Sequence, residues 1–152
     1  MTSLLAAHRP TDWNFPLFLH VFGAMILVGG LLAGASIITY ARGEIRWLRL
    51  GYWSLLFVAF PGYIVMRIGA QWIYSREGWD KLNSDPTWIG IGFAVADIGA
   101  LVTLIALIVG GIGVYRLRSG KGAGLLKAAM VLAWIVLAAA LVAVWAMAGK
   151  PN

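Results

Sequence analysis

The stretch FPLFLHVFGAMILVGGLLAGASIITYA, residues 15–41, contains no Asp, Glu, Lys or Arg. A helix needs about 20 predominantly apolar residues to cross the hydrocarbon core of a bilayer, so this stretch predicts a transmembrane span. Three further runs meet the same criterion, at residues 48–74, 88–115 and 123–148. Lipid-exposed irregular backbone and open sheet edges do not occur inside a bilayer, and all four runs are therefore expected to be α-helices.

Short connections between consecutive helices favour antiparallel neighbours. The predicted fold class is therefore all-α: a polytopic membrane protein whose single domain, residues 1–152, is an antiparallel, up-down-up-down four-helix transmembrane bundle. The composition agrees, because 61% of the residues are hydrophobic and only 12% are charged, whereas a soluble domain carries about 25% charged residues. A fold with so little charge needs lipid to cover its surface, and the lipid bilayer is the expected partner.

The net charge of +6 comes mainly from basic residues in short segments beside the apolar runs. This distribution is typical of topology signals, so no nucleic acid is expected as a partner. The absence of cysteine excludes disulfides, thiolate metal sites and cysteine nucleophiles. Residues 1–14 lack the apolar core of a signal peptide, so the first span is expected to remain in the mature protein.

The basic residues also predict an orientation. The middle loop, residues 75–87, has two basic residues against three acidic ones. The first and third loops with their margins hold seven basic residues against one acidic residue: Arg42, Arg46, Arg49, Arg116, Arg118, Lys121 and Lys127, against Glu44. By the positive-inside rule these two loops are cytoplasmic. The sequence therefore predicts a multi-pass protein of the plasma membrane with both termini on the non-cytoplasmic side.

Apart from Arg49 and Lys127 at the span margins, three residues with ionisable His, Arg or Asp side chains lie within the spans: His20, Arg67 and Asp97. At 1.5 Å per residue, their depths below the outer boundary are about 7–8 Å for the first two and roughly 13 Å for Asp97. Helical side chains lean towards their own N-terminus, so Asp97 leans outward and Arg67 leans inward. An unpaired charge at this depth is costly, and we therefore expect an Arg67–Asp97 ion pair.

The same outer half of the bundle is the predicted ligand-binding site. Tyr63 and Gln71 share a helical face with Arg67, and the predicted site comprises His20, Tyr63, Arg67, Gln71 and Asp97. The alternative interpretation is that these groups only lock helices together through interhelical polar contacts. Pro61, inside the second span, predicts a kink there.

Gly23, Gly30 and Gly34 lie on one stripe of the first span together with His20. Small residues allow close approach of helices in membranes, and Gly30-x-x-x-Gly34 has the usual spacing. The stripe is a candidate contact face for homo-oligomerisation or for a membrane partner.

A haem or copper cofactor is a further hypothesis. His20 with Met66 or Met147 offers imidazole and thioether ligands for His–Met haem or for Cu(I). Bis-His haem within one chain is not expected, because only one histidine is embedded. The sequence has no H-x-x-x-H, E-x-x-H, dinucleotide-binding or phosphate-loop motif, so enzymatic chemistry is not favoured.

The segment LHVFGAMILVGGLLAG, residues 19–34, carries a resemblance. It resembles the opening helix of small uncharacterised bacterial four-helix integral membrane proteins. It is also similar to the first helix of the copper-resistance protein D-like membrane domain, in which an early His precedes a Gly-Gly pair. The corresponding residues of this sequence are His20, Gly29 and Gly30, and Val28 stands where that family usually has Trp. This similarity implies a copper-related or membrane redox function. The hypotheses from sequence are thus ligand binding or transport support, a redox protein, and an accessory subunit of a membrane complex.

Overall fold

The computed structural model describes residues 14–81 and 86–149, and in this part of the chain four helical segments are long and apolar enough to cross a membrane. The first and fourth spans are single helices, α1 and α5. The second span consists of α2 and α3 with a π-helical turn, η3, between them, and the third consists of α4 followed by the short 3-10 helix η5. The elements are α1 (Asn14–Tyr40), α2 (Ile45–Ser54), η3 (Leu55–Ala59), α3 (Phe60–Arg76), η4 (Trp79–Lys81), α4 (Thr87–Arg116), η5 (Leu117–Ser119) and α5 (Ala123–Gly149). The described residues contain no strand, which confirms the all-α class.

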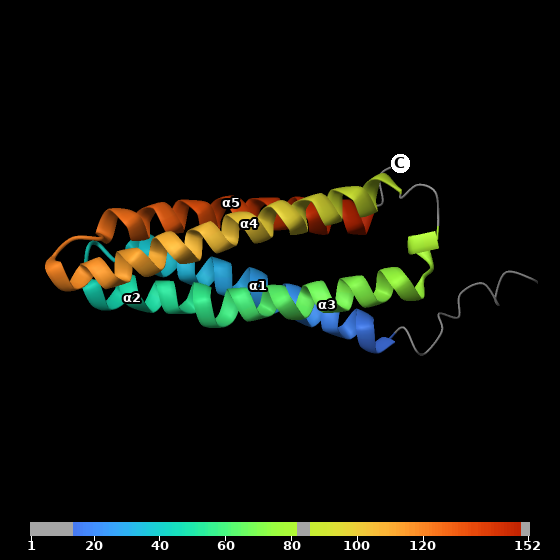
Figure 1. Ribbon diagram of the computed structural model, residues 1–152, viewed down its shortest axis with the longest axis horizontal. Coiled ribbons are helices and arrows are strands. Elements are labelled where there is room, and N and C mark those ends of the chain that lie inside the picture. The colour runs from blue at the N-terminus through green and yellow to red at the C-terminus, as the bar shows by residue number, and fades with distance from the viewer. Residues whose placement is uncertain (1–13, 82–85, 150–152) are drawn as a thin grey trace, which may run out of the picture.

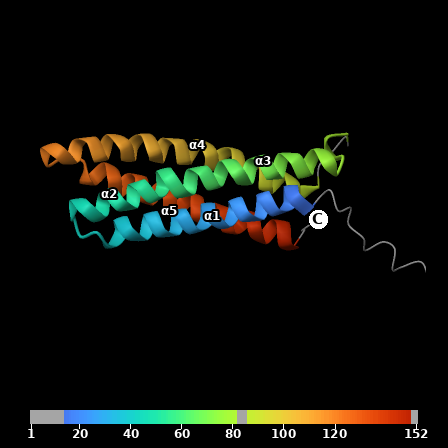
Figure 2. The same ribbon diagram turned by 90° about the horizontal axis from the view of Figure 1, so that it is seen from below.

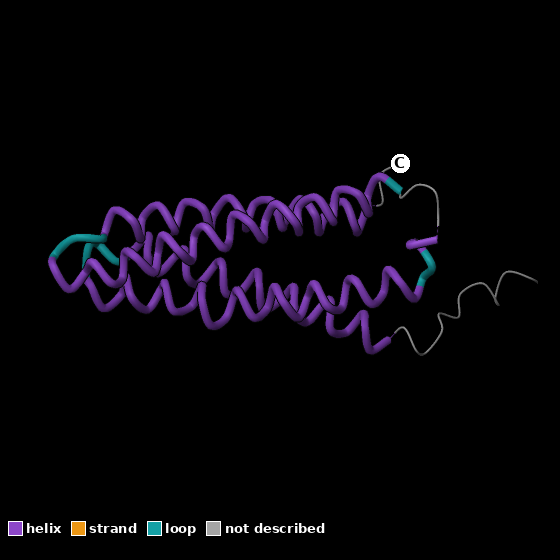
Figure 3. Tube along the Cα trace, viewed as in Figure 1, coloured by secondary structure: helices purple, strands orange, loops and turns teal. Residues whose placement is uncertain are grey.

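The four spans form a bundle in which consecutive spans run in opposite directions (Figures 1 and 2). The turns after α1 and after η5 lie together at one end, which we call the basic end, and Figure 3 shows both turns there in teal. The connection from α3 to α4 lies at the opposite end. In Figure 1, α1 with α3 and α4 with α5 form two layers that diverge towards this opposite end.

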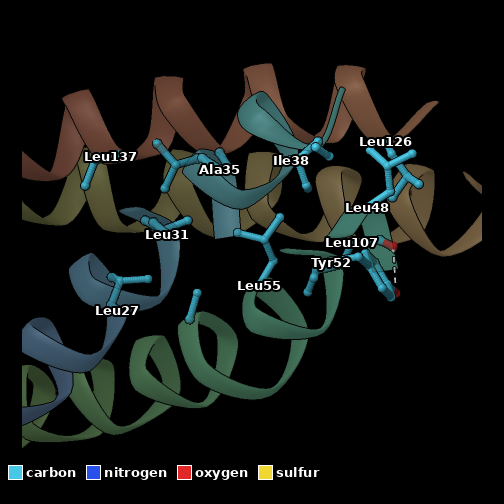
Figure 4. Packing of buried hydrophobic residues seen from close by; sticks show 14 of the residues in the cluster. Leu27, Leu31, Ala35, Ile38, Leu48, Tyr52, Leu55, Leu107, Leu126 and Leu137 are labelled. Carbon is cyan, nitrogen blue, oxygen red and sulfur yellow. Dashed lines mark hydrogen bonds between the residues drawn. The ribbon is translucent and has the colours of Figure 1, made fainter. Parts of the chain in front are cut away.

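The hydrophobic core lies in the half of the bundle nearer the basic end. Leu31, Leu48 and Leu126 are almost completely buried there, and side chains from all four spans meet around them (Figure 4). Tyr52 crosses this core, and its hydroxyl donates a hydrogen bond to the Leu107 carbonyl at 3.2 Å. In a membrane such contacts stabilise the bundle through dispersion and close packing, because lipid removes the hydrophobic drive for helix association.

The glycine stripe of α1 packs against the second span of the same chain. A Cβ added at Gly30 would lie 2.5 Å from the backbone nitrogen of Ala59, and one at Gly34 would lie 2.9 Å from the Gly51 carbonyl oxygen. Gly23 is likewise against the backbone of Met66. The stripe considered for an external partner is thus covered from within the chain, because its small residues allow α1 and the second span to touch through their backbones.

The irregularity expected at Pro61 occurs in the turn just before it. Proline lacks an N–H, and its ring clashes with the carbonyl four residues earlier, here that of Phe57. The helix widens at η3, where the Phe60 N–H bonds to the Leu55 carbonyl, five residues back. A π turn adds one residue to the turn, so the residues of α3 are rotated by about 100° relative to an uninterrupted helix.

Candidate functional site

An ion pair joins α3 to α4 in the half of the bundle away from the core. Arg67 Nη2 lies 2.7 Å from Asp97 Oδ1, which confirms the pairing predicted from depth and side-chain lean. A charge-assisted hydrogen bond of this length is a strong one. Because α3 packs extensively on α1 and only sparsely on α4, this pair is a main connection between α3 and α4.

Aromatic side chains surround the pair on both helices. The Arg67 guanidinium lies over the Phe93 ring, 4.8 Å from its centroid, in a cation–π arrangement. The rings of Tyr74 and Phe93 meet edge to face at 5.0 Å. The Tyr63 hydroxyl donates to the Ala96 carbonyl at 3.4 Å, a long and therefore weak hydrogen bond. The long side chains of these residues thus bridge helices whose backbones are separated.

Phe93 and Tyr74 were not among the predicted site residues. The available signal was helical spacing, since Phe93 precedes Asp97 by four residues and Tyr74 follows Arg67 by seven, so each shares a face with its charged neighbour. Gln71, which was predicted, is exposed, and no hydrogen bond in the described part of the chain connects it to the pair.

The ion pair is not sealed from its surroundings. The Asp97 side chain is 62% accessible and that of Arg67 is 29% accessible. Ionisable residues inside spans normally face the bundle interior or a water-filled cavity. A pair that serves only as an interhelical lock is best enclosed, because an accessible pair gains less from its mutual attraction. The arrangement leaves the Asp97 carboxylate accessible at the surface of the bundle.

His20 lies on a different side of α3 from the ion pair. Its Nδ1 is 3.2 Å from the Met66 carbonyl oxygen, where α1 packs on α3. Gly69 is also against the His20 backbone at this contact. At 100° per residue, Met66 points about 100° and Gly69 about 160° away from the face that holds Arg67. The structure therefore separates the predicted site into an α1–α3 contact with His20 and an α3–α4 pair.

The imidazole contact fixes the tautomer of a neutral His20. A carbonyl only accepts hydrogen bonds, so Nδ1 is the donor and Nε2 carries the lone pair. This is the state in which histidine binds metals, with its second nitrogen held by a backbone carbonyl. Met66 meets His20 through its backbone rather than its sulfur, and the Met147 methyl occupies the space over Gly92 of α4. Among residues 14–81 and 86–149, no three His, Cys, Asp or Glu side chains cluster as metal ligands.

Comparison with protein-family models, with curated proteins and with solved structures gives no match to this chain. The assignment of function consequently depends on the geometry and chemistry of the site.

Proposed function

We propose that this chain is a small membrane protein that binds a polar ligand at the Arg67–Asp97 pair, in support of transport. The observation that carries the proposal is an accessible ion pair between two apolar helices: Asp97 is 62% and Arg67 29% accessible. Charged groups within spans are costly and commonly mark ligand or ion pathways. The aromatic rings of Phe93 and Tyr74 supply apolar contact beside the charges.

The ligand best suited to such a pair carries both an anionic and a cationic group. Arg67 then exchanges the Asp97 carboxylate for the anionic group, and Asp97 exchanges the guanidinium for the cationic group. Neither charge is then left without a partner, and a lone charge in the apolar part of a span is costly. A ligand with a single charge would leave one of the two protein charges without a partner.

The proposed location is the plasma membrane, with the basic end in the cytoplasm. Seven basic residues against one acidic residue at the first and third loops support this orientation. The Arg67–Asp97 pair lies in the other half of the bundle, so ligands would reach it from the non-cytoplasmic side.

The test is the thermal stability of the purified protein in detergent with a panel of ligands: zwitterionic amino acids, simple carboxylates and simple amines. A zwitterion at 100 times its Kd should stabilise the protein by about 2.7 kcal/mol. The double variant Arg67→Leu/Asp97→Leu should lose this response, and the variant Lys127→Gln, which changes an exposed charge at the basic end, should keep it. Equal responses in the wild type and the double variant would assign the pair a purely structural role, as in an accessory subunit.

A second candidate is metal or haem binding through His20, because its Nδ1 contact with the Met66 carbonyl leaves Nε2 able to act as a ligand. The other ligand would come from a methionine or from a second copy of the chain. Metal analysis and a visible spectrum of the wild type and of His20→Ala test this candidate, and an equal metal content in the two proteins would exclude His20 as the ligand.

A further inference from the structure

A groove lies at the basic end, far from the Arg67–Asp97 pair. It has a volume of about 540 Å³ and runs along one face of α2, where it is lined by Ile45, Arg46, Arg49, Leu50 and Trp53. The spacing of these residues brings them onto adjacent turns of the helix. Two arginines and three apolar side chains of α2 therefore line one shallow, open groove.

The charge in the groove is not balanced by its own lining, which contains no acidic residue. Arg49 Nε is buried and has no hydrogen-bond partner among the described residues. Arg49 as a whole is only half-buried, so the remaining N–H groups of its guanidinium are available to an acceptor that enters the groove. Arg46, one turn away, is exposed and adds a second guanidinium. Arginine forms paired hydrogen bonds with phosphate oxygens, which suits this arrangement to a phosphate group.

The apolar part of the lining favours a lipid over a free anion. Trp53 is 42% exposed and stacks on Phe57, with ring centroids 5.3 Å apart. Ile45 and Leu50 are also exposed beside the arginines. Tryptophan at the end of a span typically lies at the level of lipid headgroups. A free phosphate would use the arginines alone, whereas a phospholipid also covers the apolar side chains with its glycerol and acyl carbons.

We propose that this groove binds the headgroup of an anionic phospholipid from the leaflet next to the basic end. Arg46 and Arg49 contact the phosphodiester, and Ile45, Leu50 and Trp53 contact the upper acyl chains. Basic pockets beside transmembrane helices are suited to anionic headgroups. The site is independent of the ligand proposed for Arg67 and Asp97, because the two lie in opposite halves of the bundle.

The experiment uses delipidated full-length protein in detergent, titrated with phosphatidylglycerol or phosphatidylcholine, with bound lipid counted by native mass spectrometry. The wild type should prefer phosphatidylglycerol. The variant Arg46→Gln/Arg49→Gln should bind it roughly thirtyfold more weakly, as expected when charge-assisted hydrogen bonds from two arginines to the phosphodiester are lost. The matched control Arg116→Gln/Arg118→Gln removes the same charge from exposed positions at the same end. Its affinity should stay within about twofold of the wild type, because neither residue lines the groove and neither therefore contacts the bound phosphodiester.

Three outcomes would overturn the proposal: equal binding of the two lipids by the wild type, equal losses in the two double variants, or displacement of phosphatidylglycerol by millimolar inorganic phosphate. The second outcome would show bulk charge attraction, and the third would assign the arginines to a free anion. Circular dichroism checks that each variant is folded. If the groove double variant does not fold, Arg46→Gln alone serves in its place, because Arg46 is exposed, and a loss of preference for phosphatidylglycerol is again the expected result.

Discussion

Removing either member of the Arg67–Asp97 pair should destabilise the protein more than removing both. Arg67→Leu leaves the Asp97 carboxylate without its partner at 2.7 Å, and Asp97→Leu leaves the guanidinium over the Phe93 ring. The double change leaves two apolar side chains at the contact between α3 and α4. A lone charge in the apolar part of a span is costly, so the two single effects cannot simply add.

The degree of exposure sets the magnitude of this coupling. Fully exposed ion pairs contribute roughly 0.2–1 kcal/mol, whereas breaking a buried pair costs about 3–5 kcal/mol. With accessibilities of 29% for Arg67 and 62% for Asp97, the pair lies between these limits, and we expect a coupling energy of about 1–3 kcal/mol. Arg67→Leu additionally loses the cation–π contact, about 0.5–1 kcal/mol.

The assay is equilibrium unfolding in mixed micelles with increasing dodecyl sulfate, applied to the wild type, both single variants and the double variant. A second cycle combines Arg67→Leu with Ser54→Ala. Ser54 lies 13 positions earlier, about 20 Å along the helix, so that pair should be additive within about 0.5 kcal/mol. A coupling of Arg67 with Asp97 no larger than this control would refute the reasoning, because it would mean that the ion pair contributes nothing to stability.

Three further predictions concern the packing, the orientation and the histidine. Gly30→Ala should destabilise the bundle by about 1–3 kcal/mol in the same unfolding assay, since the added Cβ would collide with the second span. The control Gly29→Ala should be neutral or slightly stabilising, because a Cβ at Gly29 meets open space. A cysteine replacing Lys81 should react with an impermeant maleimide added outside cells and one replacing Ser119 should not; the reverse pattern would invert the proposed orientation. His20→Ala should cost about 1 kcal/mol through its lost hydrogen bond. Monomeric wild-type protein should show no bis-His haem spectrum, and a bis-His spectrum that is independent of protein concentration and disappears in this variant would contradict that expectation.

The four spans could be predicted from the sequence because length and apolar composition are sufficient to define them. The segment predicted at residues 48–74 is longer in the structure, Ile45–Arg76, because the helix continues at both ends through interfacial residues such as Arg46 and Arg76. The Arg67–Asp97 contact could also be predicted, since few residues in the spans can neutralise a charge. When polar partners are this scarce, depth alone nearly determines the pairing.

The division of the predicted site could not be obtained in the same way. His20, Arg67 and Asp97 have similar depths, but depth does not specify which side of α3 faces α1 and which faces α4. That choice depends on Gly62 and Gly69, which bring α1 against one side of α3, and on the π turn at η3, which rotates α3. Proline predicts a disturbance of the helix, but a kink and a widened turn both relieve its clash, and the packing of neighbouring helices decides between them.

The unequal packing along the bundle bears on how a ligand could act at the ion pair. Near the basic end, Leu31, Leu48 and Leu126 hold all four spans together in a dense core. In the other half, α3 and α4 are connected mainly by the Arg67–Asp97 pair and its aromatic neighbours. A ligand that replaces this pair therefore alters the contact between the layers without disrupting the core. The proposed exchange of ionic partners thus requires rearrangement only where the packing is weakest, which is where local motions cost least.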